Sequence, residues 1–294
     1  MKLLQKRWFF CFPFFFLYCF SSFAECRKLC DIIQVELSSD ETEELKHLFR
    51  YLFAETEFGY TLLGDKPMSF CFPPTCSIHL SPKGKFFKIS NSDCIDVSNA
   101  LTILDKIKIN NNFIFITKRT QDGVADCLFF INRDKWIHVF NENIDAFRKV
   151  YGSKISAESF LNSLQTKNAI ADELFEQHVL LGILLGYGRQ NAELFHRRHP
   201  LYGRHKIPYA IYPKPSSPFS TIEEELCFFK KKLQILHANQ WSLLLVRQVN
   251  FAADLESLET IQLRRHYTTI HRKLTRLFSG ENWFTILLEK LCSE

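Results

Sequence analysis

The sequence lacks the short motifs that mark the common enzyme classes. It has no GxSxG, HExxH or GxGxxG pattern and no Gly-Lys-Ser/Thr sequence, so no nucleophile elbow, zinc-protease helix, dinucleotide-binding turn or phosphate-binding loop is indicated. Its ten glycines in 294 residues exclude a collagen-like or linker-dominated chain. Beyond residue 24 the longest apolar run is Val179–Tyr187, nine residues with two glycines, well short of the roughly 20 that span a membrane.

An excess of one charge is also missing once the first 24 residues are set apart. The chain has 37 basic and 32 acidic residues, and residues 1–24 hold three of the bases and none of the acids. The remaining 270 residues, with 34 bases and 32 acids, give little reason to expect a nucleic-acid partner. A hydrophobic content of 46% with 23% charged residues excludes a disordered chain, and the length suffices for one or two domains.

The first 24 residues have the order of a secretory signal peptide. Met1–Arg7 carries the positive charges, Trp8–Phe20 is an apolar run of 13 residues, and Ser22 and Ala24 are small residues at the positions a signal peptidase accepts. As a helix this run is about 20 Å long, short of the roughly 30 Å hydrocarbon core. We therefore expect cleavage after residue 24, a secreted or periplasmic protein and no stable membrane span afterwards; an uncleaved anchor is the alternative.

The cysteines are compatible with export. Eight remain after residue 24, and an even number permits disulfides in an oxidising compartment. Two pairs are close enough for local bridges, Cys26 with Cys30 and Cys71 with Cys76. The alternative is that most are buried free thiols. Neither short pair has the two-residue gap typical of zinc ligands, and no metal or cofactor is predicted.

Apolar spacing predicts an α+β fold whose N-terminal half mixes helices with an antiparallel sheet. Ser39–Thr42 begins like a capped helix, which an apolar face extends to about residue 57. Glycines then favour a turn over 59–69. The polar residues 132–135 and the apolar run Trp136–Phe140 predict a hairpin, followed by a helix over 141–151. Strand-like runs lie at 68–72, 78–80, 85–89, 113–117 and 127–131.

After Gly152 the pattern becomes mainly α-helical. Helical periodicity covers 156–164, 169–185, 190–197, 222–236, 257–278 and 281–291. The predicted organisation is a signal peptide at 1–24, an α+β region at 25–152 and a helical region at 153–294. The last two regions form either separate units or one continuous domain.

Two glycine-containing segments hold the residues with the most chemical potential. In the first, Lys66 is followed by Pro67, which has no amide to offer a phosphate, so a structural turn is favoured over a phosphate cradle. In the second, 178–190, the glycines favour close helix packing or a helix break near Tyr187. For His178 a core position on an apolar helix stripe is favoured over the role of a general base. The first candidates for an active site assembled from both segments are Tyr60, Asp65, His178 and Arg189.

Basic residues gather in two further places. The cluster 196–205 contains histidines and arginines, and a solvated turn is favoured there over an anion contact. The helix over 257–278 carries bases at Arg264, Arg265, Arg272, Lys273 and Arg276. A solvated face explains that pattern, and the alternative is a surface for an acidic partner.

Three stretches resemble a set of secreted proteins of obligate intracellular bacteria for which no activity is established. They are FGYTLLGDKPMSF at 58–70, HVLLGILLGYGRQNAELF at 178–195 and the C-terminal VNFAAD with SGENWFTILLEKL. The resemblance implies export by a bacterium that lives inside a host, and it assigns no catalytic residue.

Together these features favour an exported binding or interaction protein of the envelope or host interface, whose partner is an unknown protein or an acidic surface. The alternative is an exported hydrolase or transferase whose active site joins the 59–69 turn to the 178–190 segment. A cavity between those segments with shifted pKa values would favour the enzyme.

Overall fold

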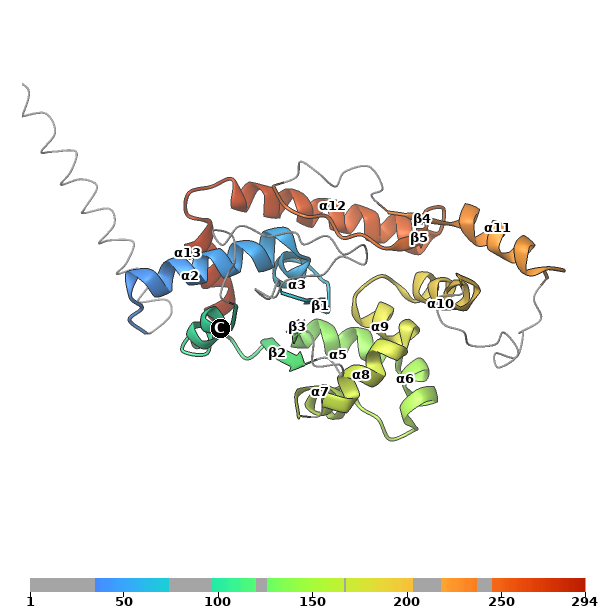
Figure 1. Cartoon of the computed structure of the whole chain (residues 1–294), viewed down its shortest axis with the longest axis horizontal. Coiled ribbons are helices and arrows are strands. Elements are labelled where there is room, and N and C mark those ends of the chain that lie inside the picture. The colour runs from blue at the N-terminus through green and yellow to red at the C-terminus, as the bar shows by residue number, and fades with distance from the viewer. Residues whose placement is uncertain are drawn as a thin grey trace, which may run out of the picture.

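The structure, a computed structural model, describes residues 35–73, 97–119, 126–166, 168–202, 218–236 and 245–293. The fold is α+β, with a small antiparallel sheet among helices and a mainly helical C-terminal half (Figure 1). The predicted signal peptide, the strand-like runs at 78–80 and 85–89, and Cys26, Cys30 and Cys76 lie outside the described residues.

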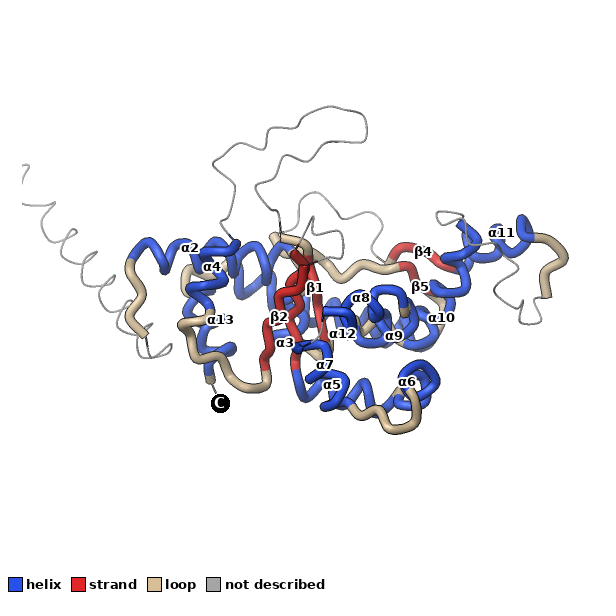
Figure 2. The backbone as a smooth tube through the Cα atoms, turned by 60° about the horizontal axis from the view of Figure 1, so that its bottom comes forward, coloured by secondary structure: helices blue, strands red, loops and turns tan. Residues whose placement is uncertain are grey.

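The main sheet has three strands in the order β1-β3-β2, all antiparallel, formed by β1 (Met68–Cys71), β3 (Asp126–Asn132) and β2 (Phe113–Arg119). The central strand, β3, is buried on both faces. Leu128 and Phe130 point into one core, whereas Phe129 and Ile131 point into the other, because successive side chains of a strand face opposite sides. Figure 2 shows the strands lying between two groups of helices.

The first core joins the two ends of the described chain. Phe130 packs edge-on to Phe53 at 5.5 Å and stacks on Phe58 at 5.4 Å, and Phe49 meets Phe284 at 5.8 Å between ring centroids. The predicted α+β and helical regions therefore share this core. Its elements are α2 (Ser39–Arg50), the π-helical turn η1 (Tyr51–Glu55), α3 (Phe58–Leu63), α4 (Val97–Leu104), α12 (Leu258–Phe278) and α13 (Trp283–Cys292).

The second core lies on the other face of the sheet and is also rich in aromatic rings. Phe140 stacks on Phe147 at 3.9 Å, and Trp136 stacks on Phe160 at 6.0 Å between centroids. Its helices are α5 (Arg133–Glu142), α6 (Ile144–Tyr151), α7 (Ala157–Thr166), α8 (Asn168–Glu176), α9 (His178–Leu184) and α10 (Arg189–Arg198).

The hairpin predicted at 132–140 was wrong, because these residues form helix α5. The Asn132 side chain caps the helix by accepting a hydrogen bond from the Lys135 amide at 3.2 Å. Trp136 and Phe140, four residues apart, then lie on one helix face, and both are fully buried. The predicted polar turn is thus a helix N-terminus.

The turn predicted over 59–69 is correct only for residues 64–67, because strand β1 begins at Met68. Residues 58–63 form helix α3, and its glycines permit close packing on α12. A Cβ atom at Gly59 would lie 2.6 Å from a methyl carbon of Leu274, and one at Gly64 would lie 3.0 Å from Cγ1 of Ile270. The glycines serve helix contact here and do not form a phosphate cradle.

The C-terminal half follows the predicted helices with two departures. The helix expected over 169–185 divides into α8 and α9 at Gln177, which leaves the helical conformation with φ −89° and ψ 69°. Helix α11 (Ile222–Lys232) ends before the predicted residue 236, and the chain continues as β4 (Leu233–Ile235), paired with β5 (Ala252–Asp254). The 3-10 turn η2 (His199–Tyr202) follows α10, and α12 matches its predicted bounds within one residue.

Cys71 is a free thiol, which departs from its predicted pairing with Cys76, and Cys127, Cys227 and Cys292 are free as well. Burial raises the pKa of the Cys71 thiol to about 12, so it stays protonated and weakly nucleophilic at neutral pH. The Cys26–Cys30 bridge stays a prediction.

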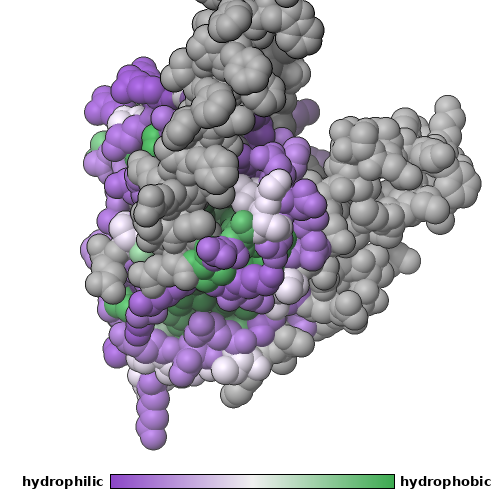
Figure 3. All heavy atoms as spheres, turned by 90° about the vertical axis from the view of Figure 1, so that its left-hand side faces the viewer, coloured by the Kyte–Doolittle hydropathy of each residue, from purple (hydrophilic) through white to green (hydrophobic). Residues whose placement is uncertain are grey.

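At the α2 and α13 end of the molecule the visible surface is mostly hydrophilic, with smaller hydrophobic areas (Figure 3). Within the described ranges, no helix combines the length and the apolar character needed to cross a bilayer.

Candidate functional site

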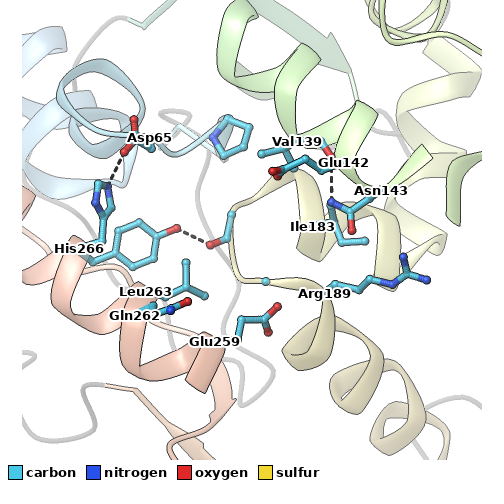
Figure 4. A pocket seen from close by; sticks show the side chains of 14 residues that line it. Asp65, Val139, Glu142, Asn143, Ile183, Arg189, Glu259, Gln262, Leu263 and His266 are labelled. Atoms are coloured by element: carbon cyan, nitrogen blue, oxygen red, sulfur yellow. Dashed lines mark hydrogen bonds and ion pairs between the residues drawn. The ribbon is translucent and has the colours of Figure 1, made fainter. Parts of the chain in front are cut away.

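A cavity of about 490 Å³ lies where three separate segments meet (Figure 4). These are the turn after α3, the α9–α10 turn with the start of α10, and the N-terminal half of α12; α5 closes one side. The cavity therefore joins the 59–69 and 178–190 segments as expected for the candidate site. Its polar lining consists of Asp65, Glu142, Asn143, Arg189, Glu259, Gln262, His266 and Tyr267.

Two glycines shape the α9–α10 turn that forms one wall. Gly186 and Gly188 have φ values of +72° and +85°, a conformation that favours glycine. The Tyr267 hydroxyl donates a hydrogen bond to the Gly186 carbonyl, and a Cβ atom at Gly186 would lie 2.7 Å from that hydroxyl oxygen. The glycines thus produce the predicted helix break near Tyr187 and bring the turn against α12.

Glu259 of α12 occupies the N-terminus of α10. Its two carboxylate oxygens accept hydrogen bonds from the backbone amides of Gln190 at 3.3 Å and Asn191 at 3.2 Å. This contact satisfies two of the free amides that begin a helix and places negative charge at the positive end of its dipole. A Cβ atom at Gly188 would overlap the carboxylate, so only glycine permits the approach.

Arg189 lines the cavity with its charge already balanced. Its guanidinium donates two parallel hydrogen bonds to the Asp145 carboxylate, both 2.8 Å long, and a third to Glu193 at 2.9 Å. These contacts raise the pKa of Arg189 and lower that of Asp145. Arg189 is therefore a fixed structural cation on the rim of the cavity.

Asp65 faces the same cavity from the opposite wall. Its carboxylate lies 2.6 Å from the Lys135 ammonium and 3.3 Å from Nε2 of His266 (Figure 4). The hydrogen bond from Lys135 is the main reason that the pKa of Asp65 lies below its usual value. Glu142 lies 3.3 Å from His138. Among the described residues, the carboxylates that line the cavity are those of Asp65, Glu142 and Glu259, which come from three different elements.

An ion pair between the fully buried Lys66 and the half-buried Glu57 holds the two segments together. The Lys66 ammonium lies 3.0 Å from a carboxylate oxygen of Glu57, donates a hydrogen bond to the Leu185 carbonyl and sits 4.5 Å from the centroid of the Tyr187 ring. Burial lowers the pKa of Lys66 despite this partner. The Glu57 carboxylate also accepts hydrogen bonds from the Tyr187 hydroxyl and the Asn250 amide, both at 3.3 Å.

No sequence pattern indicates this pair. Glycine spacing predicts a turn over 59–69, and the chemistry that the sequence suggests for Lys66 is phosphate binding, which Pro67 disfavours. The third partner, the Leu185 carbonyl, comes from a segment 119 residues away. The residues next to a lysine in the sequence do not show that it is buried, because its burial depends on partners that the fold brings from distant segments.

The other candidate residues lie elsewhere. The Tyr60 hydroxyl is buried behind α3, where it donates to the Arg247 carbonyl at 3.1 Å and lies 3.0 Å from Nδ1 of His271. Burial raises the pKa of Tyr60. His178 lines a different cavity, beside His199 at 4.3 Å between ring centroids. The structure thus brings Asp65 and Arg189 together and separates both from Tyr60 and His178.

Among the residues that the structure describes, no group of three or more histidine, cysteine, aspartate or glutamate side chains is arranged to hold a metal ion. Comparison with protein-family models, curated proteins and solved structures found no match to this chain. The function is therefore argued from the cavity and the surface alone.

Proposed function

We propose that the protein is an exported binding protein and that its acidic cavity holds a small ligand with a positive charge. The observation that carries this proposal is the arrangement of charges around the cavity. Asp65, Glu142 and Glu259 line it, and its one guanidinium, that of Arg189, is bonded to Asp145 and Glu193 outside the described lining. Lys135 meets Asp65 and His138 meets Glu142 from outside that lining too, so the described groups that face the cavity are mainly carboxylates. The volume of about 490 Å³ falls within the usual range for small-molecule sites.

The protonation states of two lining residues, Asp65 and Arg189, favour binding over proton transfer by these groups. A general acid or base works best with a pKa near the operating pH. The pKa of Asp65 is lowered and that of Arg189 is raised, so both groups stay charged at neutral pH and transfer no proton. The hydrolase or transferase alternative would need another group for proton transfer. Its candidate is His266, which lines the cavity 3.3 Å from Asp65, whereas the buried Tyr60–His271 pair does not line this cavity.

A second surface supports the wider role of an interaction protein. The outer face of α12 exposes Arg264, Arg265, Arg272, Lys273 and Arg276, and none of them forms an ion pair with a described residue. A row of exposed cations favours contact with an acidic protein or an acidic surface. This face fits the proposed role at the envelope or host interface.

The cavity is tested with two probes that differ in charge and match in shape, L-arginine and L-citrulline. We expect the full chain to bind arginine at least tenfold more tightly than citrulline in calorimetric titrations at low salt. The preference should shrink as salt screens the exposed carboxylates. In the Asp65→Asn/Glu142→Gln double variant the preference should fall to near unity.

The matched control is Glu158→Gln, an exposed glutamate on α7 that does not line this cavity and should leave arginine binding unchanged. Equal binding of arginine and citrulline by the native chain would refute the proposal. So would an unchanged preference in the double variant. Conversion of a charged probe to a product by the native chain would favour the enzyme.

A further inference from the structure

A second cavity, of about 300 Å³, lies on the other side of the α9–α10 turn. Leu181, Gly182 and Leu185 approach it from α9 and the turn, and aromatic rings close it from β1, α10 and the segment before β5. Among the described residues, the lining contains no aspartate, glutamate, lysine or arginine. It consists of Phe70, His178, Leu181, Gly182, Leu185, Tyr187, Asn191, Ala192, Phe195, Asn250, Phe251 and Ala252.

The aromatic walls are fixed by their own contacts. Tyr187 stacks on Phe251 with centroids 4.4 Å apart and planes inclined by 16°, and Phe195 meets His178 edge-on at 5.8 Å. The Tyr187 hydroxyl is held on the Glu57 carboxylate. These rings are therefore positioned before any ligand arrives, which lowers the entropic cost of binding.

One polar group in the lining lacks a partner among the described residues. Oδ1 of Asn250 is buried and accepts no hydrogen bond there, although the backbone amide of Asn250 donates to Glu57. The neighbouring Asn191 differs, because its Nδ2 donates to the Tyr187 carbonyl at 3.0 Å and its Oδ1 accepts from the Asp254 amide at 3.0 Å. Buried polar atoms are almost always hydrogen-bonded. Asn250 also lines the cavity, so its side-chain amide is the group in the described lining with hydrogen-bonding capacity left for a ligand.

We infer that this cavity binds a compact, uncharged, single-ring aromatic molecule whose hydroxyl or amino group bonds to the Asn250 side chain. The volume is at the lower end of small-molecule sites and accommodates a single aromatic ring. The described part of the lining offers no carboxylate, ammonium or guanidinium group to pair with an ionised ligand, and burying an unpaired charge is costly. A hydroxyl fits either orientation of the amide, because it both donates and accepts. The inference does not depend on the acidic cavity.

Phenol and toluene are the probes, since they share a ring and differ by a hydroxyl in place of a methyl group. Ligand-observed NMR titrations of the full chain should show both binding, phenol with a dissociation constant of about 1 mM or tighter for its seven heavy atoms. Benzoate, which adds a charge, should bind more weakly than phenol.

The decisive variant is Asn250→Leu, which keeps the side-chain size and the backbone amide that donates to Glu57. The preference for phenol over toluene should fall about fivefold, the value of one ordinary hydrogen bond. Ala252→Trp should block both probes by filling the cavity, and Gln262→Leu, in the acidic cavity, should change neither. Thermal melts check that each variant folds.

Failure of both probes to bind the native chain would overturn the inference, as would an unchanged phenol preference in Asn250→Leu. Neither result bears on arginine binding at the acidic cavity, so the two proposals fail separately.

Discussion

Replacing Lys66 by methionine tests how the two segments that form the acidic cavity are held together. Methionine keeps the apolar stem of the fully buried side chain and removes the ammonium. Glu57 then loses its cation, and the Leu185 carbonyl loses a donor. Removing one member of a buried pair costs about 3–5 kcal/mol.

We expect the low end of that range, about 3 kcal/mol. The Glu57 side chain retains 16% exposure, so water relieves part of its charge, and the Tyr187 hydroxyl and the Asn250 amide still donate to it. Glu57→Gln should cost a similar amount, since it strands the buried ammonium. The double variant should cost clearly less than the sum, because both charges are then gone.

Urea denaturation of the four proteins gives the coupling free energy, which should be about 2 kcal/mol. The control is Lys46→Met. It breaks a partly exposed ion pair in which the Lys46 ammonium lies 2.8 Å from a Glu43 carboxylate oxygen, and it should lower the free energy of unfolding by less than about 0.5 kcal/mol. If Lys66→Met costs no more than this control, or if the cycle is additive, the reasoning about the buried pair is wrong.

Three further predictions concern the cavity wall and the pH dependence of stability. Gly188→Ala should destabilise the protein by about 2 kcal/mol or more in urea, because it strains a positive φ and displaces Glu259 from α10; a loss below 0.5 kcal/mol would contradict the Glu259 contact. Burial holds the pKa of Tyr187 well above 10, so the free energy of unfolding should fall as pH rises above 10, where only the unfolded tyrosine ionises. Tyr187→Phe should reduce the slope of the free energy of unfolding against pH by up to about 1.4 kcal/mol per pH unit. Burial lowers the pKa of His271, so stability should fall as pH drops below about 6.5, where the unfolded histidine takes up its proton first, and a His271→Gln variant with the same acid slope would refute this.

Much of the fold follows from local patterns. The apolar spacing predicted α12, α13 and strands β2 and β3, because long periodic runs leave little choice of structure. The strand predicted at 136–140 was wrong, because the apolar residues of this run are compatible with a strand and with a helix. The Asn132 cap and the burial of Trp136 and Phe140 on one face stabilise the helix. The sequence of this segment alone could not predict that burial, because it depends on the rest of the chain.

The candidate site was predictable in part. Asp65 and Arg189 flank glycine-containing turns, and the cavity between those turns was expected from them. The Glu57–Lys66 pair and the Asn250 side chain were missed, because their environments are created by residues far away in sequence. A charged or amide side chain indicates a partner or a ligand only when it is known to be buried, because a buried polar group needs a hydrogen-bond partner.

The first core also has a consequence for the order of synthesis. Helices α2 and α3 emerge first, yet the residues that cover them, such as Phe284 and Leu274, belong to the last part of the chain. Contacts of such long sequence separation form late and slowly. The N-terminal part therefore has no finished core until translation is nearly complete.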